Sequence, residues 1–432
     1  MRVLVSLLAF CLLLAVPQAE AKVYIDIAQP GSHRVPVAIP ELRLLGPAPP
    51  IGEELADSLS ADLTYTGFFQ VLPRTAYLEP ASAEGVTSDT IDFRRWNLIG
   101  SHLLVTGGMS TQNGKLRLEM RLFDVLEGRM LVGKAYVGER EQAKQMVRRF
   151  AGEIVRLITG LEPIFDTRLA FVSDARGHKE IYVMDFDGSN VTPLTSMGAI
   201  TMSPSWSPDG KHVSFVSYKP GKPNIFAIDT ASRQARLLHG GNLCMSPAWS
   251  PDGSTLAVAV SFGGNTDLCL LDRQGKLLRR LTDNRTINIE PAWSPDGRRL
   301  AFVSSRGGTP QIYIMEVASG EVRRLTFSGS YNTSPAWSPR GDRIAFAGRV
   351  NGGFEIFTIT PEGGDVQQLT SGPGNNESPT WSPDGMMLAF SSTRLGGSRI
   401  FVMNANGSNQ RPIGPAKGKQ TEPAWSARLG TI

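Results

Sequence analysis

In this 432-residue sequence, the residues that commonly act as nucleophiles, acids, bases or metal ligands do not form a catalytic motif. The nucleophile elbow of hydrolases, the HExxH zinc motif, the phosphate-binding loop, the CxxC pair and the GxGxxG turn do not occur. The histidines do not pair at ligand spacing; they are His33, His102, His178, His212 and His239. We therefore expect no catalytic residues, no metal ligands and no bound cofactor.

A polar position recurs instead, immediately before a proline that stands two residues ahead of a tryptophan. The tryptophans are Trp206, Trp249, Trp293, Trp337, Trp381 and Trp425. The pre-proline residues are Ser203, Ser246, Glu290, Ser334, Ser378 and Glu422. The residues before them are Met202, Met245, Ile289, Thr333, Glu377 and Thr421. A repeat of a little over forty residues, with four short strands per unit, is typical of a β-propeller.

One unit, starting at Glu290, predicts four antiparallel strands in a meander. Its segment Ser294–Gly297 has serine, proline and glycine at the positions that a type I turn favours. Trp293 should pack against the neighbouring blade. The aspartates of these turns lie around a ring, so they cannot converge on one metal ion.

The ends of the repeat predict six blades and their closure. The first unit lacks the opening strand, and the last, "TEPAWSARLGTI", has only that strand. The C-terminal strand should therefore pair with residues 169–173. Proline cannot donate to a strand ladder and belongs on an edge strand, which in a propeller lines the central channel. The pre-proline residues should converge at the mouth of that channel. We leave open a weakly held cation such as calcium there.

The chain in front of the repeat has no such period. Residues 1–21 resemble a secretory signal peptide, with an apolar run followed by "AEA". Residues 22–162 predict a small α/β domain with a mixed sheet and helices on one side, and residues 163–432 the all-β propeller. A short helix in the first domain is expected to open at Asp89 or Thr90. No further segment is long and apolar enough to span a membrane.

Charge and cysteines exclude other classes. The net charge of +4 is spread without a basic tract, so nucleic acid is not an expected partner. Cys244 and Cys269 fall on the first and third strands of one blade, about 9–10 Å apart at ~4.8 Å per strand. That separation exceeds disulfide reach, so both should be free thiols. We expect a monomer.

A signal peptide, a small α/β domain and six WSPDG-type blades together resemble the TolB family, the periplasmic propeller proteins of the Tol–Pal system. The resemblance covers the whole chain. It implies a non-enzymatic adaptor that binds the lipoprotein Pal at the channel mouth and TolA through the N-terminal segment, besides other envelope proteins. It also implies a role in outer-membrane integrity and in constriction during division. The implied TolA-contacting residues are Lys22, Val23, Tyr24, Ile25, Asp26 and Ile27.

Single positions of the mouth can be matched to the family. Glu290 keeps the family's mouth carboxylate, Ile289 stands where a threonine can occur, and Leu243 where a polar side chain or histidine occurs. Serine replaces Glu290 in four of the other five copies, so we expect the fold not to need this carboxylate. The alternative function is an exported propeller enzyme, lactonase- or peptidase-like, with its site at the channel. A lactonase would need a calcium-binding cluster, and this mouth offers Glu290, Glu422 and Glu377 among serines.

Overall fold

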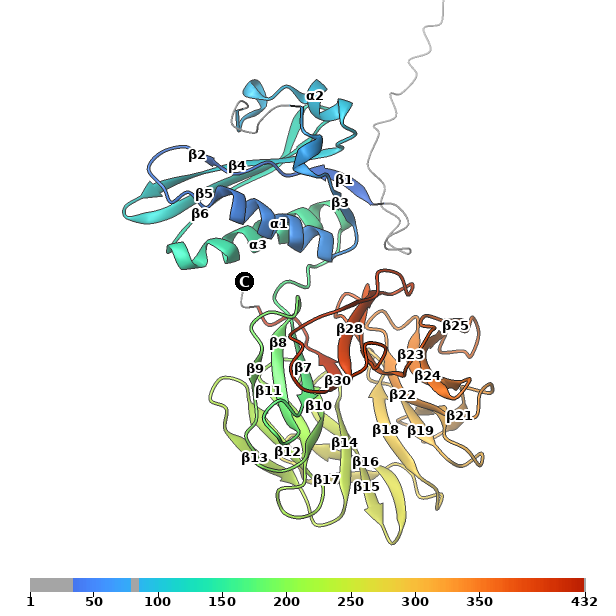
Figure 1. The fold of residues 1–432 in the computed structure, drawn as a ribbon. Helices are drawn as coiled ribbons and strands as arrows, with labels where there is room; N and C mark the ends of the chain where they lie inside the picture. The colour runs from blue at the N-terminus through green and yellow to red at the C-terminus, as the bar shows by residue number, and fades with distance from the viewer. Residues whose placement is uncertain (1–33, 79–84, 431–432) are drawn as a thin grey trace, which may run out of the picture.

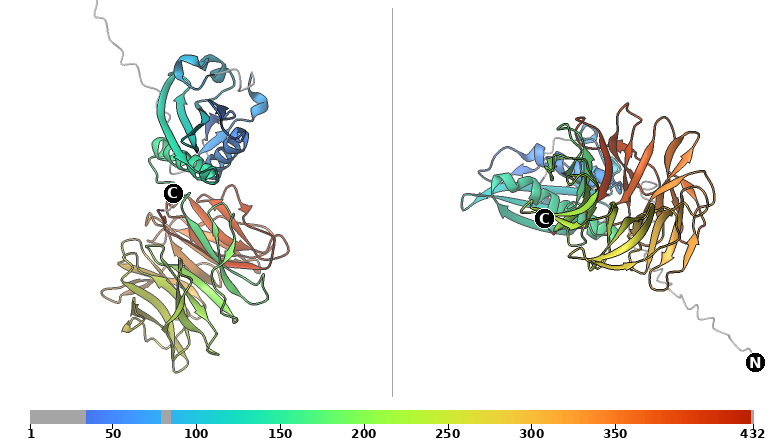
Figure 2. Two further views of the ribbon diagram at one scale, coloured as in Figure 1. Left: turned by 90° about the vertical axis from the view of Figure 1, so that its left-hand side faces the viewer. Right: turned by 90° about the horizontal axis from the view of Figure 1, so that it is seen from below.

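The computed structural model describes residues 34–78 and 85–430, which form two stacked domains (Figures 1 and 2). The expected signal peptide, residues 1–21, and the TolA-contacting residues 22–27 lie outside the described residues. In the described ranges, no helix combines the length and apolar character needed to cross a bilayer.

The N-terminal domain is built on one mixed sheet with strand order β3-β1-β4-β5-β6, and β2 pairs with β4. β1 runs parallel to β3 and to β4, whereas β4, β5 and β6 form an antiparallel meander. The strands are β1 (Val35–Ala38), β2 (Arg43–Leu44), β3 (Phe69–Val71), β4 (Leu103–Gln112), β5 (Lys115–Asp124) and β6 (Arg129–Gly138). The sequence analysis did not predict β1, because Pro36 interrupts its short apolar run.

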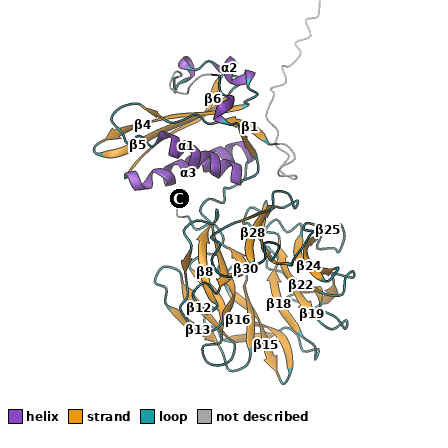
Figure 3. Cartoon of the chain, viewed as in Figure 1, coloured by secondary structure: helices purple, strands orange, loops and turns teal. Residues whose placement is uncertain are grey.

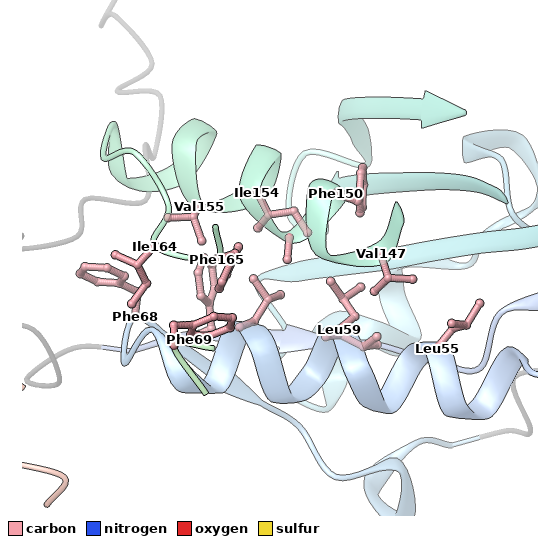
Figure 4. Packing of buried hydrophobic residues seen from close by; sticks show 14 of the residues in the cluster. Leu55, Leu59, Phe68, Phe69, Val147, Phe150, Ile154, Val155, Ile164 and Phe165 are labelled. Carbon is pink, nitrogen blue, oxygen red and sulfur yellow. The ribbon is translucent and has the colours of Figure 1, made fainter. Parts of the chain in front are cut away.

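Two long helices cover one face of this sheet, α1 (Gly52–Tyr65) and α3 (Ala143–Thr159). Leucines four residues apart on α1, Leu55 and Leu59, meet Val147 and Phe150 of α3 in one core (Figure 4). Gly160 ends α3 in a left-handed conformation, with φ of 71° and its N–H on the carbonyl of Arg156.

The prediction that the helices lie on one side was wrong for α2 (Phe93–Leu98), which lies across the sheet from α1 and α3 (Figure 3). Its Trp96 is buried in a separate core with Leu104 and Phe123. The expected start was also wrong, because Asp92 caps the helix by accepting from the N–H of Arg94 at 3.2 Å. The antiparallel meander leaves a second apolar face that needs this cover.

The second domain consists of six four-stranded antiparallel sheets, which we number as blades 1 to 6. Blade 1 contains β30 (Gln420–Trp425), β7 (Arg168–Ser173), β8 (Glu180–Asp185) and β9 (Thr192–Pro193). Blade 2 contains β10 (Thr201–Trp206), β11 (His212–Ser217), β12 (Asn224–Asp229) and β13 (Ala235–His239). Blade 3 contains β14 (Cys244–Trp249), β15 (Thr255–Phe262), β16 (Asn265–Asp272) and β17 (Leu277–Arg280).

The remaining blades repeat the same order from the inner strand outward. Blade 4 contains β18 (Asn288–Trp293), β19 (Arg299–Ser304), β20 (Gln311–Glu316) and β21 (Val322–Arg324). Blade 5 contains β22 (Asn332–Trp337), β23 (Ile344–Val350), β24 (Gly353–Ile359) and β25 (Gln367–Gln368). Blade 6 contains β26 (Asn376–Trp381), β27 (Met387–Ser392), β28 (Arg399–Asn404) and β29 (Arg411–Pro412). The six-bladed propeller predicted from the repeat is confirmed.

The ring closes as the partial units at its ends predicted. The C-terminal strand β30 pairs antiparallel with β7, with Thr421 opposite Val172 and Trp425 opposite Leu169. The N–H of Ser426 donates to the carbonyl of Arg168 at 2.8 Å beyond the last pair. The first blade is therefore assembled from both ends of the repeat.

The recurrent turn has the structure its residues favour. In blade 4 the N–H of Gly297 donates to the carbonyl of Ser294 at 2.9 Å. The Ser294 hydroxyl donates to Asp296 Oδ1 at 2.5 Å, and this bond holds the pKa of Asp296 below its usual range. The preceding Trp293 donates from Nε1 to the carbonyl of Ala248 in blade 3 at 3.1 Å. The turn residues therefore serve the blades and their packing.

Both cysteines of the propeller are free and buried, as predicted. Cys244 lies on β14 opposite Val260 of β15, and Cys269 on β16 opposite Val258 of the same strand. Burial raises the pKa of Cys244 to about 11 and that of Cys269 to about 12. These thiols stay protonated at neutral pH.

The N-terminal domain contacts the propeller through a charged and aromatic interface. Arg148 on α3 bonds both Asp62 on α1, at 3.3 Å, and Asp187 in the turn after β8, at 2.8 Å. The hydroxyl of Tyr65 donates to the carbonyl of Phe186, and their rings meet edge to face at 4.9 Å. Burial raises the pKa of Asp62 to about 6, although Arg148 lowers it.

We expect the Asp62 carboxyl to make stability fall as pH rises through this window. Its pKa is higher in the folded chain than the ordinary value of 3.8, so the folded state binds the proton more tightly between about pH 4 and 6. A shift of about two units corresponds to about 3 kcal/mol. Asp62→Asn should flatten the pH dependence of the unfolding free energy over this range, measured by denaturant unfolding.

Asp57→Asn is the matched control, because Asp57 lies on the exposed side of the same helix and pairs with Arg74. It should keep the wild-type slope between pH 4 and 6. An unchanged slope in Asp62→Asn would contradict the assignment of this titration to Asp62.

We expect truncation after Lys419 to destabilise the propeller, because it removes β30 and opens blade 1. Loss of a strand with a buried tryptophan should cost several kcal/mol and lower the melting temperature by about 10 °C or more. Truncation after Ser426 is the control, since it keeps β30 and its last hydrogen bond. Equal melting temperatures for the two truncations would contradict the closure.

Candidate functional site

A cavity of about 630 Å³ opens at one end of the propeller channel. Each inner strand begins at this end, which we call the mouth, and runs to its tryptophan at the other end. The turn after β8, which holds Asp187, lies at that other end and contacts the N-terminal domain. The mouth is therefore the end that the N-terminal domain leaves free.

Most of the predicted site residues line this cavity. The lining includes Met202, Ser203, Met245, Ser246, Ile289, Glu290, Thr333, Ser334, Glu377, Ser378 and Glu422. Leu243 does not line it; this side chain is 43% exposed and precedes β14. The repeat thus brings together residues that are about 220 positions apart in the chain.

All six pre-proline residues have a left-handed backbone conformation, with φ between 52° and 54°. The pairing of each inner strand with its neighbour shifts register at this point, so the residue and its proline form a bulge. Such a conformation costs a non-glycine residue about 1–2 kcal/mol. The pre-proline residue has no partner residue in the ladder, so its N–H is available to a neighbouring blade.

Glu290 joins two blades by accepting a hydrogen bond from one of these N–H groups, that of Ser334. Its Oε2 accepts from the N–H of Ser334 at 2.6 Å and from the hydroxyl of Thr333 at 2.6 Å, both in blade 5. These two bonds argue against the expectation that the fold does not need this carboxylate. The repeat alignment compares equivalent positions and does not show that a longer side chain reaches the next blade.

Glu422 makes the same connection on the opposite side of the ring. Its Oε2 accepts from the N–H of Ser203 at 2.7 Å and from the hydroxyl of Ser203 at 3.2 Å. Burial raises the pKa of Glu422, while these two donors lower it. This contact joins blade 1 to blade 2, across the point where the ring closes.

Glu377 is the third carboxylate of the mouth. Burial and the nearby Glu290 charge both raise its pKa. In the described parts of the chain, no three histidine, cysteine or acidic side chains are grouped so as to hold a metal ion. The mouth offers hydrogen-bond donors and acceptors to a ligand, with a negative charge that disfavours anions.

The sequence analysis named Leu243 but missed the rest of an apolar rim around part of the mouth. Ile200 is 50% exposed and Ile287 is 52% exposed; like Leu243, each stands six residues before a tryptophan. Tyr331 has the same repeat position and lines the cavity beside Phe354, with ring centroids 5.6 Å apart. Extending the alignment to this position would have found the rim on four consecutive blades.

We expect Glu290→Ala to lower the free energy of unfolding by about 1–3 kcal/mol, because it removes charge-assisted hydrogen bonds to blade 5. Ser246→Ala is the matched control at the equivalent position of blade 3 and should change stability by less than about 0.5 kcal/mol. Denaturant unfolding measures both. Equal stability of the two variants would contradict the structural role of Glu290.

Comparison with known proteins agrees with this architecture. The TolB amino-terminal domain family matches residues 23–131, and the TolB beta propeller domain family matches residues 155–429. The Tol-Pal system protein TolB of Desulfosudis oleivorans is 40% identical over 64% of this chain and 64% of its own length. That of Syntrophotalea carbinolica is 40% identical over 49% of this chain and 50% of its own. The alignments thus span less than two thirds of these relatives.

Solved structures extend the similarity to both domains. The crystal structure of TolB from Acinetobacter baumannii superposes with a TM-score of 0.80 and 25% sequence identity, covering 93% of this chain and 98% of that one. A putative TolB from Agrobacterium tumefaciens covers 59% of this chain with a TM-score of 0.50. On the evidence of the two domain matches, the chain belongs to the TolB family.

Proposed function

We propose that this chain is a non-enzymatic, periplasmic adaptor of the Tol–Pal system. In this proposal it binds the lipoprotein Pal at the propeller mouth and TolA through its N-terminal segment. It thereby supports outer-membrane integrity and constriction during division, and it needs no cofactor. The relatives that carry the name Tol-Pal system protein TolB support membership of that system.

The observation that carries the proposal is the surface at the free end of the channel. The cavity there is wide and lined by serines, prolines and carboxylates, and exposed Ile200, Leu243 and Ile287 stand beside it. Exposed apolar groups next to a polar cavity mark a surface for another protein. A folded domain that inserts a loop into the mouth could cover the rim at the same time.

The mouth carboxylates support an adaptor over the alternative of an enzyme. Glu290 and Glu422 each hold an amide of the next blade through one oxygen. A general acid or base must exchange its proton with a substrate, and a carboxylate tied into the scaffold is poorly placed to do so. Their role is to shape a fixed binding surface.

The proposed TolA site is the segment 22–27, outside the described residues. The described chain continues into β1, where the N–H of Val35 donates to the carbonyl of Phe68 at 2.9 Å. This first described strand belongs to the N-terminal domain, whereas the mouth is at the far end of the propeller. Two partners could therefore bind without competing for one surface.

The experiment for the Pal site is calorimetric titration of the mature chain with the soluble domain of Pal. Glu377→Trp fills part of the mouth and removes a carboxylate whose charge is already disfavoured by burial. We expect it to weaken Pal binding at least tenfold. Arg298→Trp, on an exposed turn at the other end of the channel, is the control and should bind as wild type. Equal affinities for the two variants would reject the mouth as the Pal site.

Deletion of residues 22–33 tests the second half of the proposal. We expect the deleted chain to lose TolA binding in the same assay and to keep its melting temperature and its affinity for Pal. Unchanged TolA affinity would remove the segment from the account.

A further inference from the structure

We propose that the mouth binds a neutral group that both donates and accepts hydrogen bonds. This group is either a main-chain peptide or an asparagine or glutamine carboxamide. The donors for it are the backbone N–H groups of four pre-proline residues, Ser246, Glu290, Ser378 and Glu422. The inference rests on the proposed function, in which a polypeptide occupies the mouth, and it specifies the chemistry of the occupying group.

Two blades show directly that the pre-proline N–H binds an oxygen acceptor. The N–H of Ser203 bonds Glu422 Oε2 at 2.7 Å, and the N–H of Ser334 bonds Glu290 Oε2 at 2.6 Å. In each case the carboxylate comes from the pre-proline position of the preceding blade. The chain thus supplies its own acceptor to two of the six pre-proline N–H donors.

The other four N–H groups lack this internal acceptor. Serine stands at the pre-proline position of each preceding blade, and its hydroxyl is two carbon atoms shorter than a glutamate carboxylate. The strand registers pass over Ser246, Glu290, Ser378 and Glu422, so none of the four has a partner residue in its ladder. All six residues share the same φ, so the four groups have the backbone geometry of the two that are filled. They form two adjacent pairs, in blades 3 and 4 and in blades 6 and 1.

The carboxylates determine which acceptor fits. Glu290 already raises the pKa of Glu377, so these charges are close enough to repel a further carboxylate. A lysine or arginine carries only donors and would leave the four N–H groups without acceptors after water is displaced. Oε1 of Glu290 and of Glu422 has no hydrogen bond from the described residues, because both bonds of each go to Oε2. A peptide or carboxamide can accept from an open N–H and donate to such an oxygen.

The test gives the open N–H groups an acceptor from a side chain of the same protein. Ser246→Gln and Ser378→Gln place, at an equivalent left-handed position, a side chain as long as Glu290. The new carboxamide oxygen should take the N–H of Glu290 or of Glu422 and leave the net charge unchanged. We expect each variant to bind the soluble domain of Pal at least tenfold more weakly, with an undiminished melting temperature. Ser246→Ala and Ser378→Ala remove the hydroxyl and leave the N–H open, and should weaken Pal binding much less than the glutamine variants.

Every other result overturns the inference. Wild-type affinity in both glutamine variants would show that the open N–H groups are not used. Equal weakening by alanine and glutamine would assign recognition to the serine hydroxyls. Ser246→Glu separates the charge classes: a neutral ligand predicts the same weakening as in Ser246→Gln, an acidic ligand a much larger one, and a basic ligand a tighter complex. Absence of Pal binding by the wild-type chain would reject the proposed function, whereas normal binding by the glutamine variants rejects only this inference.

Discussion

The unpaired edge of the innermost strands is the constraint on which this propeller depends. Six strands converge on one channel, and each has an edge that no further strand can cover. A proline in every inner strand removes one donor from that edge. The residue before it turns out of the ladder in a left-handed conformation, and Glu290 and Glu422 then bind the N–H of the next blade. Strand pairing between β30 and β7 completes the ring and keeps the six edges in register.

The binding surface follows from the same constraint. The pre-proline residues without a partner in the ladder line the cavity, where in our proposal another protein binds them. The N-terminal domain is held at the opposite end by Arg148, which bonds Asp62 and Asp187 together. A chain with one free end and one occupied end can hold different partners at the two ends. This separation is what the proposed adaptor function requires.

The sequence predicted the propeller well, because its signals are local and repeat. The Ser294–Gly297 turn, the tryptophan contact and the pairing of β30 follow from residue types at a constant interval, and so does the separation of Cys244 from Cys269. The N-terminal domain has no repeat, so each of its elements had to be predicted from a single copy. Pro36 interrupts the apolar run of β1, so this strand was not predicted. Nothing in the short apolar pattern around Trp96 indicates which face of the sheet α2 covers.

The candidate site was predicted in position and only partly in chemistry. Convergence at the mouth follows from the strand order, whereas the bond from Glu290 to Ser334 depends on how far a side chain reaches between blades 44 residues apart. Tyr218 and Phe354 also line the cavity, and they come from the ends of second and third strands, where no proline marks the position. Such contacts become visible only when the blades are placed around one axis.

Amide hydrogen–deuterium exchange with and without the soluble domain of Pal tests the central claim most directly. The account predicts that Pal slows exchange at the inner-strand amides of Ser246, Glu290, Ser378 and Glu422. The amides of Ser203 and Ser334, which the chain already bonds, should change little. Protection confined to the N-terminal domain, with the mouth amides unchanged, would contradict the account.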